Sequence, residues 1–276
     1  MRKIRIGALC LVLLLLLPLV CGCGKENGDA LRITVLNVGQ SDCILLSVGE
    51  RHMLIDTGTA SERAAVLGEL SARGIKELAY VLVTHPHEDH YGNARAVLET
   101  HTVGALMVSN EVKGDAGYEL LLQSAQGAGV ALRRMKDGDV FSLGGARCEV
   151  FCAFSEDPEG NNASLVLRVT FGTCVLLFMG DAESEAEEML LSREIAWECD
   201  FLKAGHHGSR TACTEAFLAA AKPKIVAISC GKDNDYGFPH REVLSGLAQI
   251  GARICRTDEK GTLDFICDGE TVVFEE

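Results

Sequence analysis

Apolar and polar residues alternate over several short segments in the first half of the chain, the pattern of half-buried β-strands. Strands are predicted near 31–36, 43–48 and 52–55. Residues 61–73 have the longer period of a helix, with Ser61 as its N-cap, and the apolar run at 79–83 predicts a buried strand. Helices are also predicted near 92–99 and 117–127, and strands near 103–108, 130–133, 140–143 and 148–153.

The second half of the chain repeats this mixture. Strands at 164–170 and 174–179 are predicted to form a hairpin that turns at 171–173. Further on, the pattern predicts helices near 183–191, 215–221 and 242–250, strands near 200–203 and 224–228, and terminal strands. Two β-rich halves with interspersed helices indicate an α/β or α+β domain over residues 31–276.

The N-terminus has the features of an export signal. Arg2, Lys3 and Arg5 precede an apolar run at 6–20, and a polar stretch follows at 24–29. Gly22 before Cys23 resembles a bacterial lipobox, which makes Cys23 the expected lipidated residue. We therefore expect residues 1–22 to be a lipoprotein signal peptide, residues 23–30 a short tether, and the domain to be exported and lipid-anchored on the outer face of the bacterial cytoplasmic membrane. The alternatives are an uncleaved membrane anchor, and modification of Cys21, which is less favoured because Val20 precedes it.

Charge and cysteine content argue against two properties, strong binding of polyanions by overall charge and a structural zinc cluster. The signal carries three positive and no acidic charges, so its removal takes the formal net charge from −13 to about −16. So acidic a surface binds polyanions poorly without metal ions or a local basic patch. Nine of the 12 cysteines lie beyond the signal and lipobox and contain no CxxC pair, so buried free thiols are favoured over a structural zinc cluster.

The segment His85-Pro86-His87-Glu88-Asp89-His90 directly follows the strand predicted at 79–83. A loop leaving a strand end can direct three imidazoles and a carboxylate into one small volume. These ligands suit zinc and also manganese or iron. The His85–His87 pair could hold one ion, and Asp89 with His90 a second; the alternative is a histidine-rich surface loop.

Two later segments complete the ligand set. Asp181 follows an apolar strand and a glycine, where its carboxylate could bridge two metal ions, although a lone Gly-Asp is more often a simple turn. His206 and His207 follow another predicted strand, and adjacent residues at a strand end point to opposite sides. We expect His206 to be the ligand and His207 to face the substrate, and the reverse assignment stays open.

Together these segments resemble the metallo-β-lactamase superfamily. Within it, segments 36–42, 161–167, 236–240 and 256–261 resemble the hydrolase domain of the competence protein ComEC. The resemblance implies a four-layer αββα sandwich with two divalent metal ions, zinc first and manganese second. The membrane-spanning channel of ComEC has no counterpart in this sequence, so we expect a stand-alone relative.

The resemblance has one gap. The superfamily usually supplies a further metal-binding histidine before the Gly-Asp turn, where this sequence offers Asn161-Asn162-Ala163-Ser164. Asparagine or water could complete the first metal site, which would favour manganese. We name Asn162 and Ser164 as candidate substrate-binding residues.

Other residues are candidates for supporting roles. Asp56 could orient a metal-bound histidine, although a turn aspartate is an equal alternative. His240 could contact substrate phosphate, and Lys203 could supply the positive charge that a phosphate needs, although an isolated lysine is usually an ordinary surface cation.

These residues predict a hydrolase that uses a metal-bound hydroxide, with Asp89, His207 and His240 as its catalytic residues. The likeness to ComEC indicates a phosphodiester substrate, either DNA or a cell-surface phosphodiester. A β-lactam or lactone hydrolase is a second hypothesis. The third is a non-catalytic lipoprotein that binds DNA or the cell surface through a degenerate metal site.

Overall fold

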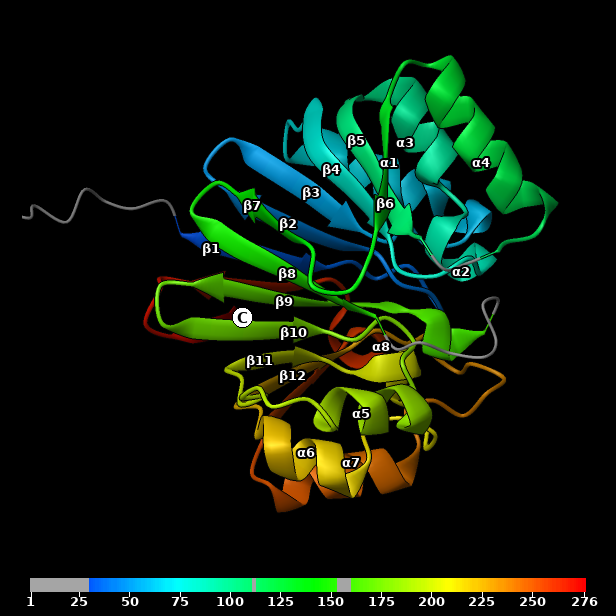
Figure 1. The fold of residues 1–276 in the computed structure, drawn as a ribbon. Coiled ribbons are helices and arrows are strands. Elements are labelled where there is room, and N and C mark those ends of the chain that lie inside the picture. Colours follow the sequence, from blue (N-terminus) through cyan, green and yellow to red (C-terminus); the bar gives the residue numbers. More distant parts are fainter. Residues whose placement is uncertain (1–29, 111–112, 153–159) are drawn as a thin grey trace, which may run out of the picture.

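The computed structural model describes residues 30–110, 113–152 and 160–276 (Figure 1). The predicted signal peptide, nearly all of the tether and the lipidation site Cys23 lie outside these residues. In the described part of the chain, no helix has the length and apolar character needed to cross a membrane.

The first sheet has eight strands in the order β15-β14-β1-β2-β3-β4-β5-β6. Neighbouring strands from β15 to β3 are antiparallel, whereas β3 to β6 run parallel to one another. The strands are β15 (Val272–Glu275), β14 (Leu263–Cys267), β1 (Leu31–Val35), β2 (Ile44–Val48), β3 (Arg51–Ile55), β4 (Glu77–Val83), β5 (Thr102–Ser109) and β6 (Ala131–Met135).

The second sheet has seven strands in the order β13-β12-β11-β10-β9-β8-β7. The predicted hairpin is present as β9 and β10, and β10 to β13 run parallel. The strands are β13 (Arg253–Arg256), β12 (Ile225–Ile228), β11 (Phe201–Lys203), β10 (Cys174–Phe178), β9 (Leu165–Phe171), β8 (Ala146–Cys152) and β7 (Val140–Leu143).

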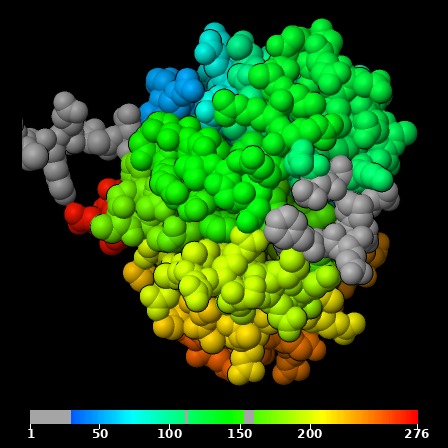
Figure 2. Space-filling model, in the orientation of Figure 1, coloured from blue at the N-terminus to red at the C-terminus, as the bar shows by residue number. Residues whose placement is uncertain are grey.

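Helices cover the outer face of each sheet (Figure 1). Apolar side chains of α1 (Arg63–Ala72), α3 (Ala94–Thr100) and α4 (Ala116–Gly127) pack on the first sheet. Those of α5 (Ser184–Leu191), α6 (Glu215–Ala221) and α7 (Arg241–Gln249) pack on the second. A third apolar cluster lies between the two sheets. The predicted four-layer αββα sandwich is confirmed, and Figure 2 shows its two halves adjoining in one body.

Three details differ from the sequence prediction. The terminal strands β14 and β15 join the first sheet beside β1, and the short helix α8 (Thr257–Lys260) was not expected. Ser61 is not an N-cap, because it lies inside the 3-10 turn η1 (Ala60–Glu62) and its hydroxyl pairs with that of Thr59 at 2.8 Å.

Candidate metal centre

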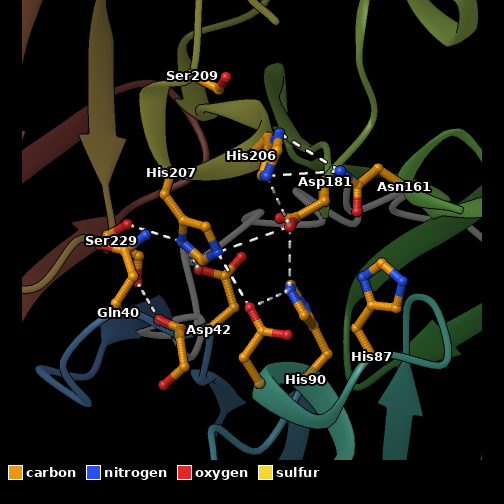
Figure 3. A network of polar contacts seen from close by, with 12 residues as sticks. Gln40, Asp42, His87, His90, Asn161, Asp181, His206, His207, Ser209 and Ser229 are labelled. Carbon is orange, nitrogen blue, oxygen red and sulfur yellow. Dashed lines mark hydrogen bonds and ion pairs between the residues drawn. The ribbon is translucent and has the colours of Figure 1, made fainter. Parts of the chain in front are cut away.

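Four side chains converge where strands of both sheets end. Asp89 and His90 belong to α2 (Glu88–Tyr91), which follows β4 after a short loop, whereas Asp181 follows β10. His207 lies in the 3-10 turn η3 (Gly205–Gly208), which follows β11. Each of the four offers one ligand atom, and these atoms all lie within 4.8 Å of one another. In Figure 3 the imidazoles of His90 and His207 point at the carboxylate of Asp181 from two sides.

The donor atoms of this cluster fit a divalent cation. Oδ2 of Asp181 lies 3.3 Å from His90 Nε2 and 3.6 Å from His207 Nε2, and His207 Nε2 lies 3.5 Å from Asp89 Oδ2. Among the described residues, His90 Nε2, His207 Nε2 and Asp181 Oδ1 are buried and have no hydrogen-bond partner. Buried polar atoms rarely lack a partner, and imidazole nitrogens with carboxylate oxygens form the ligand set that zinc and manganese accept.

His85 and His87 form a second group of possible ligands beside the four-residue cluster. His85 Nε2 is 3.0 Å from His87 Nδ1 and 4.0 Å from Asp181 Oδ2. His206 Nε2 approaches the same Asp181 oxygen to 3.9 Å, and Asn161 Nδ2 lies 3.5 Å from His206 (Figure 3). One oxygen of Asp181 is therefore near both groups of possible ligands.

The paired histidines have an unusual backbone. His206 and His207 both have positive φ, 43° and 54°, within the turn η3. Non-glycine residues rarely adopt this conformation. Because the backbone is left-handed here and not extended, our premise that the two histidines end a strand was wrong. His207 Nδ1 lies 2.9 Å from the carbonyl oxygen of Ser229 and hydrogen-bonds to it, which directs Nε2 into the cluster. The placement thus favours the assignment that the sequence left open, with His207 as the ligand.

His206 has the position of a group that faces the substrate. Its side chain is partly exposed, and its Nδ1 lies 2.7 Å from Glu183 Oε1. This pairing leaves Nε2 directed toward Asp181. The sequence reasoning missed Glu183 because the contact depends on a turn conformation that no local pattern predicts.

Buried groups behind the cluster fix its imidazoles. Asp56 Oδ2 lies 2.8 Å from His90 Nδ1, so Asp56 has the orienting position that we predicted. The backbone amide and hydroxyl of Thr84 both donate to the same carboxylate at 2.8 Å. Such outer contacts select the tautomer and hold the ring that binds a metal.

The charges of the cluster strongly influence one another. Burial lowers the pKa of His90, but the carboxylates of Asp181 and Asp56 outweigh burial and raise that pKa well above its ordinary value. Burial raises the pKa of Asp181, but His90 and His207 outweigh it and hold the pKa well below the usual carboxyl range. Burial and the neighbouring His90 lower the pKa of His85. Asp181 is therefore ionised at neutral pH, the form that binds cations.

Sequence comparison identifies the family to which this arrangement belongs. Residues 36–232 match the profile of the Metallo-beta-lactamase superfamily. The chain belongs to this superfamily. All four residues of the candidate metal centre lie within the matched region.

Two curated relatives match almost the whole chain. ComE operon protein 3 of Bacillus subtilis is 32% identical over 278 residues, which cover 94% of this chain and 35% of that protein. Competence protein ComA of Neisseria gonorrhoeae is 29% identical over 276 residues, covering 94% of this chain and 38% of that protein. The predicted likeness to the ComEC hydrolase domain is thereby confirmed, and the chain spans little more than a third of the length of these relatives.

A solved structure supports the fold alone. The metallo-beta-lactamase fold protein YhfI of Bacillus subtilis has a TM-score of 0.61 at 13% identity, covering 86% of this chain and 99% of that protein.

Three residues that we named as substrate-binding candidates make structural contacts, and for Lys203 the structure corrects our expectation. Lys203 is fully buried, and its Nζ lies 2.7 Å from Asp42 Oδ2, so its charge does not face solvent. Ser164 is also buried, and its hydroxyl accepts a hydrogen bond of 3.0 Å from the backbone amide of Asp181. A side chain at Gly180 would lie about 3.0 Å from Thr84 and 3.1 Å from Ser164, so glycine lets the Asp181 turn pack against both.

Asn162 has a structural contact at the start of a helix. Its Oδ1 accepts hydrogen bonds from the backbone amides of Glu183 at 2.9 Å and Ala186 at 3.3 Å, at the start of α5.

An Asn162→Ala variant is expected to lose about 1 kcal/mol of unfolding free energy in urea titrations, because two amides at the helix start lose their acceptor. Asn37→Ala, which alters an exposed asparagine, is the control and should not change stability. Equal stability of the two variants would contradict this capping role.

His240 lies beside the cluster but not within it. It precedes α7, and its Nδ1 accepts a hydrogen bond of 3.0 Å from the backbone amide of Arg210. A neutral His240 therefore carries its proton on Nε2, where it can donate. The ring centroid of Phe238 lies 5.0 Å from that of His240 and 5.3 Å from that of His206, so Phe238 packs between His240 and the candidate metal centre. Phe238 belongs to segment 236–240, which carried part of the ComEC resemblance, but the sequence had assigned it no role.

Proposed function

We propose that this superfamily member is a metal-dependent phosphodiesterase related to the ComEC hydrolase domain. The superfamily and the candidate ligands support a metal-dependent hydrolase. One observation carries the proposal most strongly: the buried, partnerless Nε2 atoms of His90 and His207 converge on the carboxylates of Asp89 and Asp181. The phosphodiester substrate is proposed from the likeness to the ComEC hydrolase domain, which the two relatives support.

Two divalent ions fit the side chains present. His85, His87 and Asp181 would hold one ion, and Asp89, His90, Asp181 and His207 the other. Bound ions of this kind lower the pKa of water toward neutrality and stabilise charge on the attacked phosphorus. Zinc suits these ligands, and manganese is the second candidate because asparagine replaces one imidazole near the first group.

The chain's own residues supply orientation and proton transfer. Asp56 and the Ser229 carbonyl fix the rings of His90 and His207 through their Nδ1 atoms. His206, paired with Glu183, would give a proton to the departing oxygen, a role for which the sequence had offered His207 or His240. His240, with its proton on Nε2, is placed to contact phosphate oxygen at the rim.

Location and substrate follow as further proposals. We propose export and lipid anchoring through Cys23, which would place the enzyme outside the cytoplasmic membrane. The substrate would then be DNA or a cell-surface phosphodiester outside the cell.

Metal analysis coupled to hydrolysis of bis-p-nitrophenyl phosphate tests the function. We expect about two ions per chain, and removal of the metal by a chelator should abolish hydrolysis. His207→Ala should lose both metal and activity, whereas the matched His101→Ala, at the end of α3, should keep both. Activity that survived complete metal removal would refute the mechanism. Nitrocefin turnover without phosphodiester turnover would favour a lactam hydrolase.

A further inference from the structure

A row of flat rings leads from solvent to the metal centre. The ring of Tyr236 stacks on that of Phe238, with centroids 5.4 Å apart and planes 19° from parallel. Phe238 in turn faces His207 at 6.4 Å and 20°. Three aromatic planes are therefore nearly parallel, and the innermost belongs to a candidate metal ligand.

The outer ring of this row is open to solvent. Tyr236 is 66% exposed, more than any other large apolar side chain that is exposed in the described part of the chain. Phe238 is only half-buried. An aromatic ring held this far out in water gains little from burial, so folding alone does not account for its position.

The loop that carries these rings is fixed in place. Asn234 donates from Nδ2 to the carbonyl oxygens of Gly231 and Phe238 and accepts at Oδ1 from the Phe238 amide, with distances of 2.7–3.0 Å. The His240 amide donates to Gly208 at 2.9 Å, which ties the loop to turn η3. A side chain at Gly208 would lie 2.6 Å from Pro239, so the two segments pack closely. A ring platform that is already ordered loses little entropy when it binds a ligand.

We propose that the exposed ring of Tyr236, supported from behind by the parallel ring of Phe238, forms a stacking subsite for an unpaired nucleic-acid base, whose neighbouring phosphodiester would lie at the candidate metal centre. This inference rests on the proposed phosphodiesterase function and identifies its substrate as single-stranded nucleic acid. Every base has a flat face, so the subsite would tolerate any base. A paired base is already stacked within its duplex and has no free face to offer.

The charge of the chain supports this kind of contact. With a net charge of −13, the protein gains little affinity for a polyanion from its overall field. Stacking on an aromatic ring involves no net charge, so it can supply the affinity that electrostatics does not. The contribution of the base should accordingly not depend on salt concentration, unlike phosphate contacts.

Binding of two labelled single strands of equal charge tests the subsite. Fluorescence anisotropy would compare an octathymidylate with an eight-unit abasic strand, using the full-length chain purified in detergent. Wild type should bind octathymidylate more tightly, and Tyr236→Ala should raise its Kd by about 5- to 150-fold without changing the Kd of the abasic strand. Tyr236→Phe keeps the ring and should bind like wild type. Val140→Ala, at another exposed apolar residue, is the matched control.

Three results would overturn the subsite. The first is that the wild type shows no measurable binding of octathymidylate. The others are that Tyr236→Ala raises the Kd of both strands by the same factor, or leaves the Kd of octathymidylate unchanged. Hydrolysis of the two strands, measured separately, distinguishes the two proposals. Base-dependent binding without hydrolysis of either strand would refute the phosphodiesterase and leave the subsite intact. Hydrolysis of both strands, with equal binding of the strand with bases and the abasic strand, would refute the subsite and leave the phosphodiesterase intact.

Discussion

Replacement of Asp181 by alanine is expected to reduce phosphodiester hydrolysis by about 10³-fold or more, since the two proposed ions would supply several kcal/mol of charge stabilisation. Oδ2 of Asp181 lies 3.3–4.0 Å from nitrogens of His85, His90 and His207. It is thus the carboxylate shared by both proposed ligand groups, and its loss should affect both ions. Rates with bis-p-nitrophenyl phosphate and metal content of the same sample would be measured together.

The control for Asp181 is Glu119→Ala, which removes an exposed carboxylate on α4 and should leave rate and metal content unchanged. Ser164→Ala should have an intermediate effect, because the Asp181 amide loses its acceptor while the carboxylate remains. An Asp181→Ala variant with wild-type rate and full metal content would rule out the shared carboxylate.

Lys203→Met is expected to lower the free energy of unfolding by about 3–5 kcal/mol, the cost of breaking a buried ion pair on one side. Lys203 and Asp42 both have fully buried side chains, and their charged atoms lie 2.7 Å apart. Without Lys203, the buried Asp42 carboxylate would lose the cation that lies 2.7 Å from it. Urea unfolding, followed by circular dichroism, measures the loss.

Two further variants show whether burial causes this effect. Lys222 forms an equally short pair of 2.6 Å with Glu198, but both side chains are about two-thirds exposed. Lys222→Met should therefore have almost no effect on stability. Combining Lys203→Met with Asp42→Asn should restore much of the loss, because the unbalanced charge is gone. Equal effects of Lys203→Met and Lys222→Met would contradict a stabilising buried pair.

The order of helices and strands was accessible from the sequence, because each depends on a local period of apolar residues. The metal-binding run was accessible for the same reason: a buried strand places His85 to His90 at its end, and the residue types suit a cation. The position of Asp56 behind His90 also followed, since parallel neighbours β3 and β4 end at the same edge.

Other site features depend on contacts between distant parts of the chain. Lys203 pairs with a residue 161 positions away, so nothing near it in the sequence distinguishes it from a surface lysine. The backbone of His206 and His207 depends on close packing around the turn, where a side chain at Gly205 would lie 2.5 Å from the Ala182 carbonyl oxygen. Strands β14 and β15 join the first sheet through pairing with β1, a register that no local pattern encodes.

The direction of β1 determines how far the candidate metal centre lies from the first described residues. Leu31 pairs with Val48 and Cys267 at one end of the first sheet, whereas Val35 pairs with Ile44, beside the loop that carries Asp42 toward His207. At about 3.3 Å per residue, the strand separates these two ends by more than 10 Å. In Figure 1, β1 begins at the left of the molecule and α2 lies at the right. If residues before Leu31 held the chain to a surface, as we propose, the candidate metal centre would therefore lie at the end of β1 that is farther from the point of attachment.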